Sequence, residues 1–344
     1  MRPSLFSSCS EETHVRFSLA RKVYAASVVF STAMEEGARL VLTTSAGLRA
    51  GEKVLVVIDE GTRSVGEAFL TAAKGLGTDP ALLEIRARTT DGEEPPEPVG
   101  TAMAAADLVL LATTYSLTHT HARRSANRAG ARVISMPGIE EGMLRQGGLA
   151  TDWAKIHEVV RRTARRLRGA REVHLTSAAG TDLSFSLEGR DWISEDTGLC
   201  TRKGTVTTLP AGELFIAVVE GTASGRLVVD VHFEERLRGP ATAQIADGTA
   251  SRIVGAQAAV DAMNRGGKDG RALGRFGFGL NPQARVMGPH LEAEKAVGSA
   301  HLGFGDNLVI GGKIHPGVRV ECILSEVRVE VDSRAVIEKG RLVE

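Results

Sequence analysis

The sequence predicts a two-domain α/β protein, with an N-terminal Rossmann-like domain on a parallel sheet and a C-terminal α+β domain rich in antiparallel strands. Its 344 residues suit two hydrophobic cores better than one. Up to about residue 136, continuous apolar runs of strand length alternate with segments of helical spacing. After residue 172 the pattern changes to short alternating stretches separated by glycine. We therefore expect a leader at 1–19, a Rossmann-like domain at 20–170 and an α+β domain at 171–344.

The elements of the first domain follow from its apolar spacing. Helices are expected at 20–48, 65–76, 99–105, 120–129 and 153–168, and strands at 54–58, 81–85, 107–112 and 132–136. Strands that are apolar throughout are typical of a parallel sheet covered on both faces, which binds ligands beyond its carboxyl ends. Those ends fall at 59–63, 113–120 and 136–138. Asp59-Glu60-Gly61 follows the first strand in place of a Gly-x-Gly-x-x-Gly motif, so a dinucleotide site has little support.

The second domain is predicted from period-two patterns. Strands are expected at 173–176, 183–187, 214–219, 227–231 and 318–323, and helices at 251–263 and 291–297. The glycines of 221–225 are expected to form a hairpin turn between two strands. The glycine-rich stretch 274–282 brings the backbone close either to a ligand or to another strand.

Composition limits the kinds of partner. The chain has 42 basic and 42 acidic residues, which argues against capture of nucleic acid or of an anionic membrane and favours a small-molecule or peptide partner. It contains no run of signal-peptide or membrane-spanning length. Three widely spaced cysteines cannot form a disulfide framework and suggest a reducing compartment, so we expect a cytoplasmic protein.

The densest group of polar residues lies in the last quarter of the chain. Carboxylates and imidazoles are ligands that suit zinc, cobalt, manganese or ferrous iron. The group comprises Glu292, Glu294, His301, Asp306, His315 and Glu321. Scattered carboxylates and histidines of an ordinary surface would give a similar pattern, so both interpretations stay open.

A second candidate is His119, in Ser116-Leu117-Thr118-His119-Thr120 after the third strand of the first domain. If Thr118 caps the following helix, His119 stands at the mouth of the parallel sheet. There it could donate a proton or anchor a substrate. The alternative is a capping loop with a partly exposed histidine.

Eight stretches, in order between residues 20 and 336, resemble the aminopeptidase T type of metallopeptidase, also called leucyl aminopeptidases, and its relative, the ferrous-iron 2,5-dihydroxypyridine dioxygenase. They are LRAGEKVLVVID (48–59), EPPEPVGTAM (94–103), SLTHTHARR (116–124), GARVISMPGI (130–139), LPAGELFIAVVEGTASGR (209–226), FGFGLNP (276–282), EAEKAVGSAHLGFGDN (292–307) and GGKIHP (311–316). The resemblance implies a Rossmann-like first domain, a divalent metal site in the second domain and a homo-oligomer.

The resemblance carries over to only some of the functional residues. Glu213 and His301 match metal ligands of the peptidases, and His119 matches a histidine of the dioxygenase that acts on substrate. Arg275 stands where the peptidases have a second glutamate, and Arg319 and Glu321 stand at their late His-x-Asp pair, which also holds iron in the dioxygenase. A guanidinium cannot donate a lone pair to a metal, so two ligands are missing.

Three hypotheses follow from this pattern. The first is an aminopeptidase-like hydrolase of a peptide or small amide, with Glu213 as catalytic residue and a reduced metal site of Glu213, His301, His315 and Glu321. The second is a ring-cleaving dioxygenase-like enzyme that acts on a small aromatic. The third is a metal-free enzyme or binding protein in which Arg275 and Arg319 hold an anionic ligand. In a purely structural alternative, the arginines form salt bridges to Glu213 or Glu321.

Overall fold

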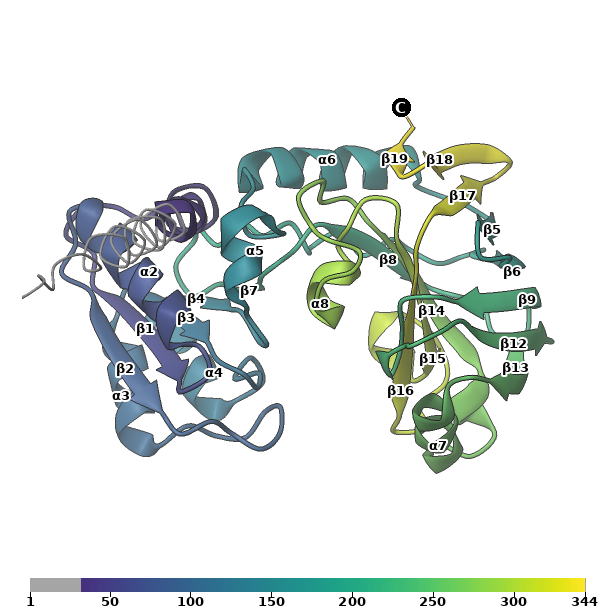
Figure 1. Cartoon of the computed structure of the whole chain (residues 1–344), viewed down its shortest axis with the longest axis horizontal. Coiled ribbons are helices and arrows are strands. Elements are labelled where there is room, and N and C mark those ends of the chain that lie inside the picture. Colours follow the sequence, from purple (N-terminus) through teal and green to yellow (C-terminus); the bar gives the residue numbers. More distant parts are fainter. Residues whose placement is uncertain (1–31, 344) are drawn as a thin grey trace, which may run out of the picture.

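The computed structural model describes residues 32–343, arranged in two lobes (Figure 1). The first lobe contains a parallel sheet of order β2-β1-β3-β4-β7. Its strands are β1 (Val54–Asp59), β2 (Ala81–Ile85), β3 (Leu108–Ala112), β4 (Arg132–Ser135) and β7 (Val206–Thr208). The first four confirm the sequence prediction. β7 pairs with β4 although it lies beyond residue 170, where the sequence pattern put the domain boundary.

Helices cover both faces of the parallel sheet, because its central strands β1 and β3 are buried at every position and apolar except at Asp59. Leu55 and Val57 pack with residues of α3 and α4, whereas Val56 and Ile58 pack with residues of α2 and of the segment before β1. The helices are α2 (Arg63–Gly75), α3 (Glu97–Ala105), α4 (His121–Ala129) and α5 (Glu141–Gln146). Residues 32–40 are helical and continue into a π-helical turn, η1 (Val41–Ser45). The expected leader 1–19 and the first part of the expected helix 20–48 lie outside the described residues.

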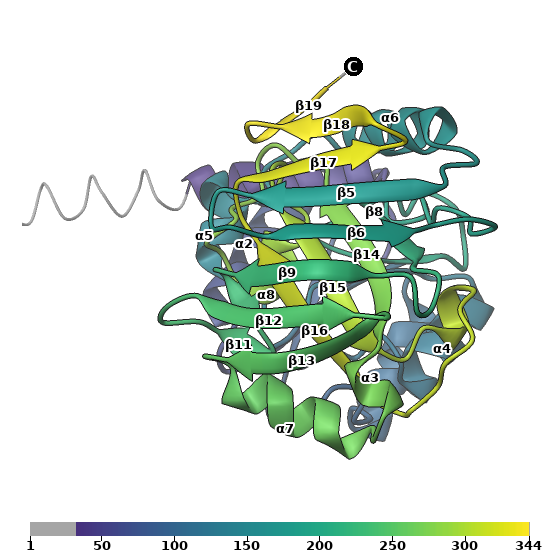
Figure 2. The same cartoon turned by 90° about the vertical axis from the view of Figure 1, so that its right-hand side faces the viewer.

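The second lobe stacks two antiparallel sheets (Figure 2). The eight-stranded sheet, order β13-β12-β9-β6-β5-β17-β18-β19, comprises β5 (Glu172–Ser177), β6 (Asp182–Ser186), β9 (Ser224–Val229), β12 (Ala241–Ala246), β13 (Thr249–Val254), β17 (Val327–Val331), β18 (Arg334–Glu338) and β19 (Arg341–Leu342). The six-stranded sheet, order β11-β10-β16-β15-β14-β8, comprises β8 (Glu213–Ala217), β10 (His232–Phe233), β11 (Glu235–Arg236), β14 (Leu273–Gly279), β15 (Ala300–Gly305) and β16 (Arg319–Leu324). The α/β class, with one parallel and two antiparallel sheets, is as predicted.

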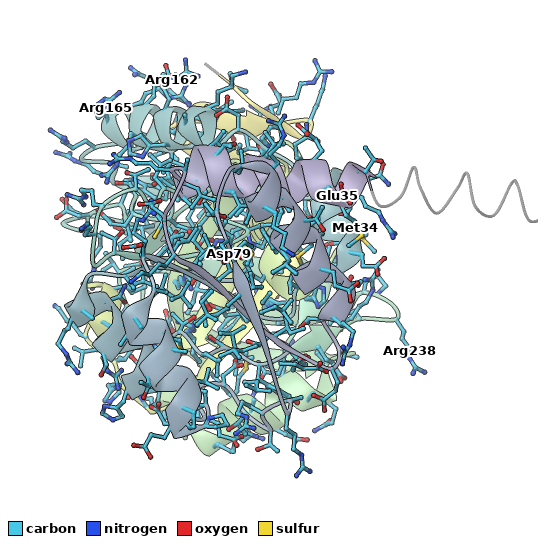
Figure 3. All side chains as sticks on the ribbon, turned by 90° about the vertical axis from the view of Figure 1, so that its left-hand side faces the viewer. Met34, Glu35, Asp79, Arg162, Arg165 and Arg238 are labelled. Atoms are coloured by element: carbon cyan, nitrogen blue, oxygen red, sulfur yellow. The ribbon has the colours of Figure 1, made fainter. Side chains whose placement is uncertain are left out.

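Helix α6 (Trp153–Arg166) joins the two lobes and confirms the helix expected at 153–168. Arg162 and Arg165 are exposed and project from it at the edge of the molecule (Figure 3). The remaining short helices are α7 (Gln257–Arg265), α8 (His290–Ala293), η2 (Asp269–Arg271) and η3 (Leu308–Ile310). Within residues 32–343, every helix is too short or too polar to cross a membrane.

Three local predictions in the second lobe are wrong. The expected helix 251–263 begins only at Gln257, because residues up to Val254 pair with β12 as strand β13. The glycines of 221–225 do not form a hairpin: β8 belongs to the six-stranded sheet and β9 to the other, so this turn carries the chain between sheets. The expected helix 291–297 is a single turn, α8, after which the chain bridges Asn281 and Gly279.

Candidate functional site

The candidate site lies on one face of the six-stranded sheet. Side chains on a strand alternate between faces, so Arg275, Gly277 and Gly279 of β14 share a face. The register places Gly277 opposite His301 of β15, and Gly303 between Arg275 and Glu321 of β16. The apolar residues between them, such as Phe276 and Phe278, face the hydrophobic core. The site therefore alternates charged residues with glycines over a packed core.

The glycines give the charged side chains room to lie flat on the sheet. A Cβ at Gly277 would stand 2.2 Å from Cε1 of His301, and a Cβ at Gly279 would stand 2.2 Å from the carbonyl oxygen of Ala296. Both distances are far inside van der Waals contact. Of the two alternatives for the stretch 274–282, the described residues show the second: the backbone closely approaches other parts of the chain.

Arg275 binds two carboxylates within this face. Its Nη1 donates to Oε1 of Glu321 at 2.8 Å, and its Nη2 donates to Oε1 of Glu213 at 3.2 Å. The guanidinium carbon also lies 4.0 Å from the ring centroid of Phe215, a cation–π distance. Since its side chain is only 9% exposed, Arg275 is committed to these groups, as in the structural alternative.

Lys295 adds a second buried cation. Its Nζ lies 2.8 Å from Glu213 Oε1, 3.2 Å from Asp196 Oδ2 and 3.3 Å from Glu294 Oε2. The side chain is 6% exposed, and a buried lysine is stable only when paired. Oε1 of Glu213 thus contacts both buried cations.

His301 and Glu213 form a buried pair. His301 Nε2 lies 2.7 Å from Glu213 Oε2. Both atoms are buried, and beyond this contact neither has a hydrogen-bond partner among the described residues. Nδ1 of the same imidazole is also buried without a partner among the described residues, and a buried polar atom of this kind points to a further group that would satisfy it.

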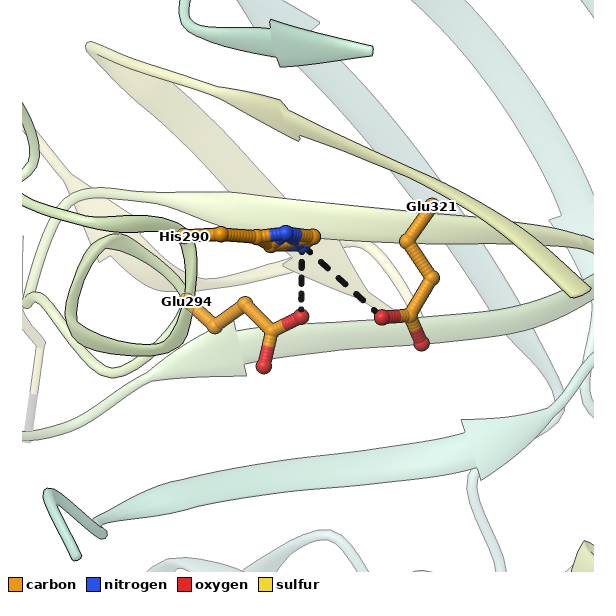
Figure 4. A group of neighbouring side chains, drawn as sticks. All are labelled: His290, Glu294 and Glu321. Atoms are coloured by element: carbon orange, nitrogen blue, oxygen red, sulfur yellow. Dashed lines mark hydrogen bonds and ion pairs between the residues drawn. The ribbon is translucent and has the colours of Figure 1, made fainter. Parts of the chain in front are cut away.

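A third set of groups converges beside this network (Figure 4). His290 Nε2 lies 3.1 Å from Glu294 Oε1 and 3.8 Å from Glu321 Oε2. Within residues 32–343, these three residues are the only His, Cys, Asp or Glu side chains whose ligand atoms, three or more together, lie within 4.8 Å of one another. The ring of His290 stacks on that of His232 at 5.3 Å, which fixes its orientation. We call these three residues the triad.

Burial and neighbouring charge shift the pKa values of the carboxyl groups in opposite directions. Burial raises the pKa of Glu294 to about 7, and the charge of Glu321 adds to that effect. Burial likewise raises the pKa of Asp196 to about 6, although Lys295 opposes it. At Glu321, burial is outweighed by Arg275 and Arg319, so its pKa falls to about 2. Glu321 is ionised near neutrality, whereas Glu294 is half protonated.

The pKa values of three further groups in the cluster are also shifted. Burial raises the pKa of Glu213, but Lys295, His301 and Arg275 outweigh it and hold that pKa well below its usual range. Burial would lower the pKa of Lys295, yet the surrounding carboxylates raise it instead. Burial lowers the pKa of His290. A neutral imidazole at His290 keeps a lone pair for binding.

The donors predicted from sequence do not converge as a set. Glu213 and His301 lie together, and Glu321 joins them through Arg275. His315 instead pairs with Asp306 in the loop before β16, where its side chain is 65% exposed. His315 therefore lies apart from the other three predicted donors, and the triad contains only Glu321 of the predicted set. Arg319 lies at the rim, 52% exposed, with Nε 3.2 Å from Glu321 Oε1.

His119 lies in the first lobe, exposed in the loop between β3 and α4. Thr120, rather than Thr118, caps α4 by accepting a hydrogen bond from the backbone of Arg123. The side chain of Thr118 instead donates to Ser135. The prediction of Thr118 as cap is wrong, and an acid or base role of His119 stays a prediction.

Sequence reasoning missed His290, Lys295 and Asp196. The spacing of His290 and Glu294, four residues apart, was a usable signal, because residues at this spacing lie on one face of a helical turn. Lys295 offered no signal, since a lysine beside glutamates is typical of a solvated surface.

The family model described as 2,5-dihydroxypyridine 5,6-dioxygenase matches residues 38–344. Among solved structures, 2,5-dihydroxypyridine dioxygenase from Pseudomonas putida KT2440 is similar with a TM-score of 0.67 and 24% identity, covering 90% of this chain and 96% of that one. The aminopeptidase AmpT from Thermus thermophilus is similar with a TM-score of 0.62 and 15% identity, covering 92% of this chain and 100% of that one. At these identities the two structures show a shared fold. No curated protein matches the chain in sequence.

Proposed function

Since the chain belongs to the 2,5-dihydroxypyridine 5,6-dioxygenase family, we propose that it is a metal-dependent oxygenase-type enzyme that acts on a small hydroxylated aromatic. The family match over residues 38–344 supports an oxygenase more strongly than a peptidase. The single structural observation behind the proposal is the buried cluster of opposite charges on the six-stranded sheet, which reaches solvent at His290 and Arg319. Burying so many ionisable groups is costly unless they serve a site.

Arg319 is the group best placed to bind the substrate. Its side chain is 52% exposed and shares one carboxylate oxygen with Arg275. A phenolate or carboxylate of a small aromatic would pair with the free side of this guanidinium through charge-assisted hydrogen bonds. Arg275, the other predicted anion-binding residue, is buried and already binds Glu213 and Glu321, so its role here is to position those carboxylates.

A bound divalent metal would supply Lewis-acid activation of the substrate at the cluster. Around it, Glu213 anchors Arg275 and Lys295 and stays ionised, while Glu294 can hold or release a proton near neutrality. His315 lies apart from the other three predicted donors, so a metal in the cluster would need a different set of ligands.

An aminopeptidase-like hydrolase is the second candidate, because AmpT shares the fold. Both kinds of enzyme would bind substrate at the same cluster, so the reaction catalysed distinguishes the two candidates. A homo-oligomeric state, a cytoplasmic location and the absence of nucleic-acid or membrane partners stay predictions.

Activity assays on the metal-loaded chain test the proposal. We expect oxygen uptake with 2,5-dihydroxypyridine or a related hydroxylated aromatic, and no release of product from leucyl aryl amides. Arg319→Gln should raise KM about tenfold or more, because a charge-assisted hydrogen bond contributes about 1.5–3 kcal/mol, with kcat changed less. Arg319→Lys, which keeps the charge, should restore part of the loss. Amide hydrolysis without oxygen uptake would replace this proposal with the peptidase.

A further inference from the structure

We propose that His290, Glu294 and Glu321 bind a divalent first-row metal ion, at a site displaced from the Glu213 and His301 positions that the family resemblance indicates. This inference rests on the proposed function only because both place a metal in the same cluster. Metal binding can be measured without any substrate. The inference assigns metal binding to two residues, His290 and Glu294, that match none of the family's ligand positions identified from the sequence.

The geometry of the triad suits an ion. Ligands at about 2.0–2.2 Å from a metal lie roughly 3 to 4 Å from one another. In the triad, the two separations from His290 Nε2 are 3.1 and 3.8 Å, and all three ligand atoms lie within 4.8 Å. One imidazole with two carboxylates suits manganese, ferrous iron or zinc.

The cations of the cluster direct the free carboxylate oxygens toward this point. Oε2 of Glu294 faces Lys295, which leaves Oε1 toward His290. In Glu321, Oε1 binds Arg275 and Arg319, which leaves Oε2 toward His290. These cations act as neighbours that orient the metal ligands, as hydrogen-bonded groups do in known metal sites.

The net charge of the cluster is negative when its carboxylates are ionised, and a divalent cation would balance it. Four acidic side chains are at most 18% exposed, namely Asp196, Glu213, Glu294 and Glu321. Arg275 and Lys295 supply two buried positive charges. When all four carboxylates are ionised, two negative charges remain, which equals the charge of one divalent cation; Arg319, half exposed, is screened by solvent.

An independent observation also points to a further group at this place. Both ring nitrogens of His301 are buried, and apart from the 2.7 Å contact of Nε2 with Glu213 they have no partner among the described residues. His301 interacts electrostatically with both Glu294 and Glu321, so it borders the triad. A water molecule bound to an ion at the triad would give the imidazole the missing partner.

The Glu213 and His301 positions suit an ion less well. Two cations contact Oε1 of Glu213, at 2.8 and 3.2 Å. Placing a divalent ion on the same carboxylate would bring three positive groups together in a poorly solvated site. The displacement of the metal therefore follows from the arginine at position 275 and the lysine at position 295.

The test measures metal affinity of the full chain after chelator treatment. Mn²⁺ is titrated by calorimetry and by electron paramagnetic resonance of the free ion. We expect one site per chain. His290→Ala and Glu294→Gln should each weaken it at least about tenfold. His315→Ala, which changes an exposed histidine, should leave the affinity unchanged, and circular dichroism confirms that each variant is folded.

Glu321→Gln provides a second, nearly isosteric test, since its amide oxygen can still accept from Arg275. It too should weaken Mn²⁺ binding. No binding by the unaltered chain, or binding that His301→Ala removes and His290→Ala does not, would overturn the displaced site. Metal binding at the triad without oxygen uptake would instead overturn the proposed substrate and leave this site intact.

Discussion

Removing the guanidinium of Arg275 should strongly destabilise the second lobe. Arg275→Gln breaks ion pairs of 2.8 and 3.2 Å with Glu321 and Glu213, whose side chains are 15% and 4% exposed. Breaking a buried pair by deleting one partner costs about 3–5 kcal/mol, because the stranded charges stay desolvated. We expect the free energy of unfolding to fall by about that amount at pH 8, where the carboxyl groups are ionised.

Arg319→Gln is the matched control, since Arg319 pairs with the same Glu321 at 3.2 Å but is 52% exposed. An exposed pair contributes only about 0–1 kcal/mol. Urea unfolding of the metal-free protein, followed by fluorescence, compares the two. Trp192 is a suitable reporter because its ring lies 5.6 Å from that of Phe278, which belongs to the same strand as Arg275.

The comparison has a clear refuting result. Equal losses in the two variants would show that burial does not decide the contribution of Arg275. A loss in Arg275→Gln below about 1 kcal/mol would show that the ion pairs only offset the desolvation of their own charges. Lowering the pH to 5 should reduce the loss in Arg275→Gln, because the stranded carboxyl groups then take up protons.

Two further predictions concern single positions. Gly277→Ala should displace the ring of His301, since the added Cβ would lie 2.2 Å from its Cε1; we expect a lower unfolding midpoint, while Gly239→Ala, with open space around the new methyl group, should be close to neutral. Asp182 raises the pKa of His174 above its ordinary 6.5, so this pair stabilises the protein below about pH 6.5 and loses its effect as the pH rises through the raised value. The stability of His174→Gln should lack this component, and the same pH dependence in both proteins would contradict the assignment.

Much of the fold could be predicted because its signals are local. The run Val54–Asp59 is apolar at nearly every position, and both of its faces are buried. Strand β7 could not be predicted, because Val206–Thr208 is three residues long and becomes a strand only by pairing with β4. The pairing of Thr249–Val254 with β12 likewise overrode a helical pattern.

The site was only partly predictable for a related reason. His301 and Glu321 were found in the polar group of the last quarter of the chain and Glu213 through the resemblance, and the structure brings all three to one face of the sheet. The sequence also showed that Arg275 stands at a position where the resemblance implies a metal ligand. It could not show that Lys295 is buried among three carboxylates, since that burial depends on contacts between distant segments.

The glycines of β14 and β15 determine how much space the charged side chains of the site have. Arg275 lies over Gly303, where an added Cβ would stand 3.0 Å from Cβ of Arg275 and 3.6 Å from its Cδ, and the ring of His301 lies over Gly277. Because this space comes from a glycine on the neighbouring strand, a larger residue at position 303 would disturb both ion pairs of Arg275 without changing either carboxylate.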